Sequence, residues 1–412
     1  LEHAVVVLAD DALLEHNTIE VVVRGAATDS AVPGGFLPGV HGRGGLHLRS
    51  LCERVRVIDN LIRGGSGNGI TLGDLPVLEG RDDVDVTFRK AYIYDRLEAQ
   101  TLKRLQDTFN GTLYNIAIEE NTIQSMGLAG IGIIAFFSLE RIELLLRVED
   151  LTIYRNSITH CAQQIPTDLP NTMLGEVGFG GITLADCENA IIQENRIEKN
   201  GVNHLDPICG ILILMGEKVD ISNNRILDNG PRTSATNDNV QKGLRGGIVI
   251  AMSFKSLNLK LLNDREFLSP DGIPAVRVHG NIVTQPLGQA LILLALGPVS
   301  IVGNQFTSQG ADFRVNPLSL IAGTIYILNL GISQDLLAFL LLVSFRNLAS
   351  GSNDALGKNY RSTQGGIAET IRRILYLPSG NVLFANNQTT LDLRTEEVNV
   401  AFSSQAIASL DD

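Results

Sequence analysis

Three segments of the chain gather charged side chains of both signs, and they are where we first look for chemistry. The segments are residues 163–177, 201–207 and 231–244, and each follows a short apolar run. Carboxylate, imidazole and guanidinium groups presented together on loops would form a mixed wall suited to ligand binding. The alternative is a solvated edge whose charges pair with one another. The candidate ligand-binding residues are Glu176, His204, Asp206, Arg232, Asp238 and Arg245.

Signatures of catalysis and of metal binding are missing from the sequence. No CxxC or Cys/His spacing indicates a metal site, so the four cysteines are expected to be free, packed thiols. A polysaccharide hydrolase needs two carboxylates across a cleft, but the pairs Asp10-Asp11 and Asp82-Asp83 are isolated and lack the His and Arg companions that such a catalytic set requires. No phosphate loop or dinucleotide fingerprint occurs. We therefore expect no cofactor and no metal, and no catalytic residue is assigned.

The elements that position these loops are indicated by an internal repeat, which fixes the architecture. An asparagine recurs with Ile, Val or Phe two residues after it and apolar residues five and three before it. Apolar residues at a spacing of two indicate a short strand with one buried face. The anchors are Asn17, Asn60, Asn121, Asn156, Asn195, Asn224, Asn281 and Asn304, with a looser ninth at Asn387.

A second short apolar strand opens with glycine in most repeats, as at Gly69, Gly181 and Gly210. The shortest spacing between anchors, from Asn281 to Asn304, gives the bare rung, and longer spacings contain insertions. Such strands suit a coil in which each turn stacks in parallel on the previous one and insertions project outward. The asparagine side chains are expected to hydrogen-bond along the axis as a ladder.

This pattern resembles the right-handed parallel β-helix repeat family, the pectate-lyase-like superfamily, over about residues 4–310 and again from Val382. The resemblance implies an all-β fold, a right-handed parallel β-helix solenoid with loop and short helical insertions. One fold hosts many functions, so the resemblance alone assigns no activity.

The enzymatic motifs of that superfamily are not matched. The Asn-Thr-Asp, Asp-Asp, Gly-His-Gly and Arg-Ile-Lys motifs of polygalacturonase-type members do not follow one another here, and the epimerase motif Asp-Pro-His-Asp stops at Asp206-Pro207. A lyase member would need an Arg base with acidic calcium ligands. Arg232 or Arg245, with Asp206 and Asp238, match that requirement by residue type only.

Composition narrows the classes of partner. The net charge is −12 and no Lys/Arg run occurs, so a basic groove for nucleic acid is not expected. Aromatic residues are 5% and Trp is missing, which argues against a long stacking platform for sugars. The apolar run 336–343 is too short to span a bilayer, so no membrane span is expected.

The repeat predicts a single domain over residues 1–412, with insertions at about 74–111, 253–273 and 331–379 and a short amphipathic helix near 97–105. The first apolar strand starts close to Leu1, and a bare strand edge invites aggregation. We therefore expect a longer polypeptide or a covering partner, in an extracellular or particle-associated setting.

The resulting functional hypothesis is a non-catalytic structural or surface binding module whose partners are polysaccharide or other subunits of a larger assembly. The alternative is a carbohydrate-active lyase or hydrolase of the pectate-lyase-like superfamily, with calcium as a cofactor if it is a lyase.

Overall fold

The computed structural model describes eleven segments of the chain, and every regular element within them is a β-strand. The expected insertions, including the helix near 97–105, lie outside these segments apart from their edges, and so do most of the loop residues. No helix among the described residues is long and apolar enough to cross a membrane. The described segments are residues 3–22, 44–73, 112–133, 146–163, 179–203, 208–231, 245–254, 274–308, 324–329, 382–392 and 405–408.

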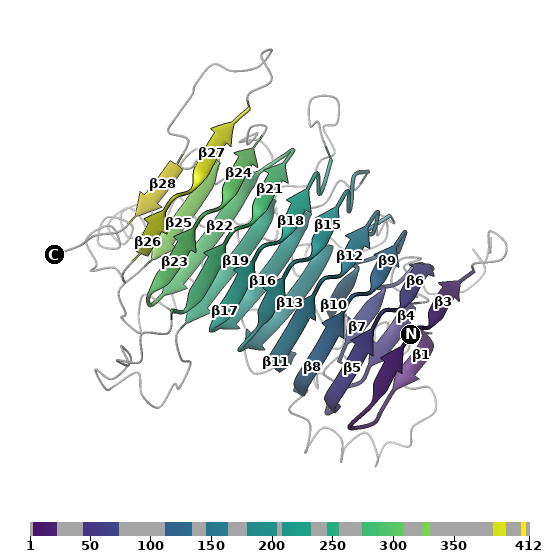
Figure 1. The fold of residues 1–412 in the computed structure, drawn as a ribbon. Helices are drawn as coiled ribbons and strands as arrows, with labels where there is room; N and C mark the ends of the chain where they lie inside the picture. Colours follow the sequence, from purple (N-terminus) through teal and green to yellow (C-terminus); the bar gives the residue numbers. More distant parts are fainter. Residues whose placement is uncertain are drawn as a thin grey trace, which may run out of the picture.

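The chain coils through three faces on each turn, and each strand pairs in parallel with its equivalents on neighbouring turns (Figure 1). The first face is a separate sheet of nine described strands. Its members are β3 (Thr18–Val21), β6 (Leu61–Gly64), β9 (Thr122–Gln124), β12 (Ser157–Thr159), β15 (Arg196–Glu198), β18 (Arg225–Leu227), β21 (Ile282–Gln285), β24 (Gln305–Ser308) and β27 (Gln388–Leu391).

The second and third faces belong to one larger sheet, because several strands continue around the corner between them. The second face holds β1 (His3–Val7), β4 (Gly44–Leu48), β7 (Ile70–Leu72), β10 (Ile131–Ile133), β13 (Gly180–Glu188), β16 (Cys209–Glu217), β19 (Gly246–Phe254), β22 (Gln289–Leu296), β25 (Ile325–Asn329) and β28 (Gln405–Ala408). The third face holds β2 (Leu13–Glu15), β5 (Glu53–Ile58), β8 (Leu113–Glu119), β11 (Arg147–Tyr154), β14 (Ile191–Gln193), β17 (Val219–Ser222), β20 (Val276–His279), β23 (Val299–Val302) and β26 (Val382–Ala385).

The core is built from aligned aliphatic side chains, as the repeat predicts. Ile62, Ile123, Ile158, Ile197 and Ile226 pair in register along the first face and are fully buried. Each lies two residues after its anchor asparagine. Because parallel strands stack about 5 Å apart, these side chains form one continuous apolar row, and the predicted inward stack is confirmed.

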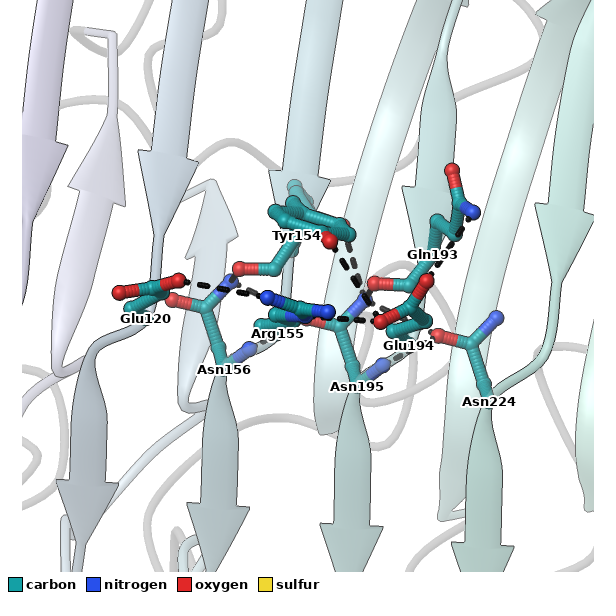
Figure 2. A network of polar contacts seen from close by, with 9 residues as sticks. Glu120, Tyr154, Arg155, Asn156, Gln193, Glu194, Asn195 and Asn224 are labelled. Atoms are coloured by element: carbon teal, nitrogen blue, oxygen red, sulfur yellow. Dashed lines mark hydrogen bonds and ion pairs between the residues drawn. The ribbon is translucent and has the colours of Figure 1, made fainter.

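The asparagine ladder is also confirmed, at the corner between the third and first faces (Figure 2). Nδ2 of Asn156 donates to Oδ1 of Asn195 at 3.0 Å, and Nδ2 of Asn195 donates to Oδ1 of Asn224 at 2.9 Å. The same link joins every successive pair of anchors from Asn17 to Asn387. The interior anchors are buried, so the ladder satisfies amide groups that would otherwise be costly to remove from water.

The glycines that open the second-face strands are required by close packing. A Cβ at Gly69 would lie 2.3 Å from Cγ2 of Ile123, and one at Gly181 would lie 2.3 Å from Cγ2 of Ile197. These separations are far inside van der Waals contact. The absence of a Cβ at each of these glycines therefore leaves the space that the inward isoleucine of the repeat occupies.

Non-glycine residues adopt positive φ at recurring corner positions of the turn. One position immediately precedes the anchor asparagine, as at Arg155 and Glu194, and another lies four residues after it, as at Lys199 and Asp228. Left-handed backbone is uncommon for such residues. The repeat therefore holds charged side chains at fixed points on the outer rim of the coil.

One predicted boundary moves. The second insertion was expected to begin at residue 253, but strand β19 continues through Phe254 because Ser253 and Phe254 pair with Ala295 and Leu296. The order of strands otherwise follows the anchors, and the described chain runs from one end of an elongated stack to the other (Figure 1).

Candidate functional site

The three charged loops leave the coil at one corner, on three successive turns. They connect β12 to β13, β15 to β16 and β18 to β19, from the first face to the second. Strands β13, β16 and β19 pair directly with one another, so the loops end on adjacent rungs. Of the candidate residues, Glu176, His204, Asp206, Arg232 and Asp238 lie outside the described residues, and their convergence stays a prediction.

Arg245 is the one candidate that the structure describes, and it is buried, with 1% of its surface exposed. It directly precedes strand β19, and its charge acts on the thiol of Cys209. The sequence predicts that Arg245 faces a ligand from a loop. Its burial changes that expectation, and removing a buried charged partner destabilises a fold.

A cavity of about 350 Å³ opens on the first face. Strands β15 and β18 supply its floor, and the corner residues that follow them supply its rim. Three cationic and two anionic side chains line it, which leaves one positive charge. The lining residues are Arg196, Glu198, Lys199, Arg225, Leu227 and Asp228.

Glu198 lies between two arginines of neighbouring rungs. Oε2 of Glu198 forms an ion pair with Nη2 of Arg196 at 2.6 Å, and Nε of Arg225 donates to Oε1 at 3.3 Å. Arg196 and Arg225 pair in register, and both side chains are 61% exposed. Burial alone would raise the pKa of Glu198, but the bonds and charges of Arg196 and Arg225 hold that pKa below its ordinary value. The carboxylate therefore stays ionised.

The cavity is formed by the strands that lead into two of the loops, yet its central residues were missed. Lys199 and Asp228 lie just before the loops at 201–207 and 231–244. Arg196 and Arg225 each directly follow an anchor asparagine. Two arginines at the same position of consecutive repeats were the signal that could have found the site.

A second charged cluster surrounds Arg147 where the second face turns into the third. Arg147 donates to Glu149 at 2.8 Å and to Asp186 at 3.1 Å, and it also binds Glu188. The carboxylate of Glu217 is 3.8 Å away. Burial raises the pKa of Asp186 although Arg147 opposes that shift. The charged groups of this cluster are therefore engaged with one another.

A third network follows the corner that carries the asparagine ladder (Figure 2). Nε of Arg155 donates to Glu194 at 2.8 Å, and its Nη1 lies 3.8 Å from Glu120. The guanidinium also lies 4.9 Å from the centre of the Tyr154 ring. These side chains are at least one-third exposed where they carry charge, so the network is a row on the surface.

The outward row of the second face carries no carboxylate in the strands that the structure describes from β4 to β25. Its members alternate with Leu46 and Leu48 and their equivalents, so they lie on the opposite side of the sheet, yet Thr71, Thr183, Val249 and Ile292 are at most 1% exposed. The row consists of His47, Thr71, Gly132, Thr183, Leu212, Val249, Ile292 and Tyr326.

The four cysteines are free and buried, as expected. Burial raises the pKa of the Cys161 and Cys209 thiols to about 12 in each case. A thiol with so high a pKa is a poor nucleophile at neutral pH. Among the described residues, no group of three or more His, Cys, Asp or Glu side chains is arranged to hold a metal ion.

Comparison with known proteins gives one match. The family model described as the right handed beta helix region matches residues 45–263, just over half of the chain. No curated protein and no solved structure matches.

Proposed function

Because the chain belongs to the right-handed β-helix family, whose fold does not dictate an activity, we propose that it is a non-catalytic structural or surface binding module. The family match establishes the β-helix fold. The proposal concerns what the coil does, and it follows from how its surface charges are used.

One observation carries the proposal, namely the state of Glu198 in the cavity on the first face. A general acid in glycoside hydrolysis needs a carboxyl group whose pKa is raised so that it keeps a proton. The pKa of Glu198 is lowered, because Arg196 and Arg225 bind its ionised form. The buried carboxylate of this cavity is therefore suited to holding two arginines in place and unsuited to donating a proton.

The outward row of the second face supports the same proposal. Thr71, Thr183, Val249 and Ile292 of this row are at most 1% exposed. In the described strands the row therefore offers no carboxylate pair and no guanidinium base to a substrate.

The test is an activity assay on acidic and neutral polysaccharides, with and without calcium. Polygalacturonate, alginate and xylan are incubated with the purified chain, and reducing ends and the ultraviolet absorbance of unsaturated sugar ends are followed. We expect no increase over a heat-denatured sample, together with retention of the folded chain on at least one immobilised polysaccharide. Release of sugar ends above that control would identify a lyase or hydrolase and overturn the proposal.

A further inference from the structure

We propose that the cavity on the first face binds an oxyanion through hydrogen bonds donated by Arg196 and Arg225. The inference deepens the proposed function, because it gives the binding module a site and a ligand chemistry. The ligand is a carboxylate, sulfate or phosphate group, either free or attached to an acidic sugar.

The two arginines are spaced to share one anion. They are paired residues of adjacent parallel strands, so their backbones lie about 5 Å apart. Both project from the same side of the sheet as Glu198, and both are exposed. An oxyanion seated between them would receive charge-assisted hydrogen bonds from two neighbouring guanidinium groups, which are among the strong kinds of hydrogen bond.

Each guanidinium retains donors for that ligand. An arginine carries five N–H groups, and Glu198 engages Nη2 of Arg196 and Nε of Arg225. Nε and Nη1 of Arg196, and both Nη atoms of Arg225, make no hydrogen bond to any other described residue. Glu198 therefore fixes the position of both side chains, and within the part of the chain that the structure describes it leaves at least one edge of each guanidinium without a hydrogen bond.

The charge balance of the pair also favours an added anion. Like charges placed directly opposite each other on neighbouring strands are destabilising, and the single carboxylate of Glu198 offsets only one of the two arginines. Lys199 and Asp228 add one charge of each sign at the rim, where the corner backbone holds both residues at positive φ, so the cavity keeps one net positive charge. A bound anion would neutralise the remaining charge of the arginine pair, so binding and local stability are linked.

The cavity is larger than a bare inorganic ion requires. Its volume of about 350 Å³ lies at the small end of the range for ligand pockets. Leu227 contributes an apolar wall beside the arginines. An acidic sugar unit, with its anionic group between Arg196 and Arg225 and its ring against Leu227, would use both features.

The test is calorimetric titration of the full chain at constant ionic strength with four probes. The probes are inorganic sulfate, inorganic phosphate, a galacturonate oligomer and a neutral xylo-oligomer. We expect an anionic probe to bind, the neutral oligomer not to bind, and the affinity to fall as sodium chloride is raised. Binding of the oligomer at least tenfold tighter than either ion identifies an acidic sugar as the ligand, and equal affinities identify a site for free ions.

Variants make the test specific to the cavity. The double variant Arg196→Gln/Arg225→Gln is expected to weaken the anionic probes at least tenfold. The matched control is Arg63→Gln, because Arg63 lies on the same face in strand β6 and, among the described residues, forms an ion pair with Glu20 only. That control should bind normally. The variant Arg196→Lys/Arg225→Lys keeps the charge but loses the planar fork, and an intermediate affinity would show that geometry matters.

The inference is overturned if the parent binds none of the anionic probes, or if the glutamine double variant binds them as the parent does. Thermal unfolding of each variant confirms that the comparison is made on folded protein. Release of sugar ends in the activity assay would instead overturn the proposed function, so the two failures are distinguishable.

Discussion

The clusters around Glu198 and Arg147 use the same ion-pair chemistry with opposite balances of charge. In the cavity, two exposed arginines share one buried carboxylate. At the other cluster, Arg147 is only 23% exposed and faces four carboxylates, with Lys218 3.6 Å from one of them and 3.9 Å from another.

This difference separates a surface that can accept a ligand from one that is committed to the fold. Glu149, Glu188 and Glu217 are paired in register, so their like charges would repel without Arg147 and Lys218. Solvent access leaves the arginines of the cavity open to an added anion. Burial at Arg147 makes each partner necessary to the others.

The largest expected loss of stability follows from replacing Ile197, which lies between two cavity residues of strand β15. Ile197 points into the core, while Arg196 and Glu198 on either side line the cavity. We expect Ile197→Ala to lower the free energy of unfolding by about 2–5 kcal/mol, through lost transfer energy and a cavity. Chemical denaturation measures it. A loss below about 1 kcal/mol would show that the strand is not anchored by this side chain.

Loss of Arg147 should rank next. The substitution Arg147→Met leaves buried Asp186 and the three glutamates without their main cation, and breaking a buried pair costs about 3 kcal/mol or more. The matched control is Arg155→Met, because Arg155 also binds two carboxylates but is 53% exposed. Exposed pairs contribute about 1 kcal/mol or less. Equal losses in the two variants would remove the distinction between the clusters.

Replacing Glu198 should have a smaller effect. Glu198→Gln removes the carboxylate that holds Arg196 and Arg225, but both side chains can turn into solvent, so we expect a loss of about 1 kcal/mol. Denaturation at low and high salt measures it. Because salt screens the repulsion between the two arginines, the loss should shrink at high salt. A loss as large as that of Arg147→Met would mean that the cavity is a structural cluster too.

The smallest effect is the dependence of stability on pH, and its sign should differ between the clusters. The lowered pKa of Glu198 gives stability that is present above its unfolded pKa and is lost as pH falls through the folded pKa. The raised pKa of Asp186 gives stability that is present below its unfolded pKa and is lost as pH rises through the folded pKa.

This difference is tested by measuring the free energy of unfolding from about pH 3 to about pH 7, a range that includes the ordinary pKa values of carboxyl groups. In Glu198→Gln the rise of stability with pH should become shallower, and in Asp186→Asn it should become steeper. Shifts in the same direction for both variants would contradict the assignment.

The sequence predicts the structural features that recur in each rung. The anchor asparagines, the isoleucine two residues later and the opening glycine recur because each rung packs directly on the next, so each was readable and each is confirmed. A second amide contact, from Nδ2 of Asn200 to Oδ1 of Asn229, was missed because it joins only two rungs.

Residues outside the repeat could not be placed in the same way. A loop between rungs has no neighbour that fixes its conformation, so the sequence placed its ends and not its side chains. Arg245 was taken for a loop residue and is buried instead, since the start of strand β19 lies inside the packed corner. The two arginines of the cavity directly follow anchors and were readable from the sequence, whereas the Arg147 cluster depends on the register of strands β11, β13 and β16.

The asparagine ladder also disfavours folding of the coil with its strands out of register. Side chains alternate along a strand with a period of two, so a slip by two residues would still turn the aliphatic residues inward. The same slip would move each anchor out of line with the next and break the links between Asn195 and its two neighbours. Each buried amide left without a partner costs about 1–3 kcal/mol. A folding chain of similar rungs thus meets a penalty for every misaligned turn, and the column of anchor asparagines excludes registers that the apolar rows alone would allow.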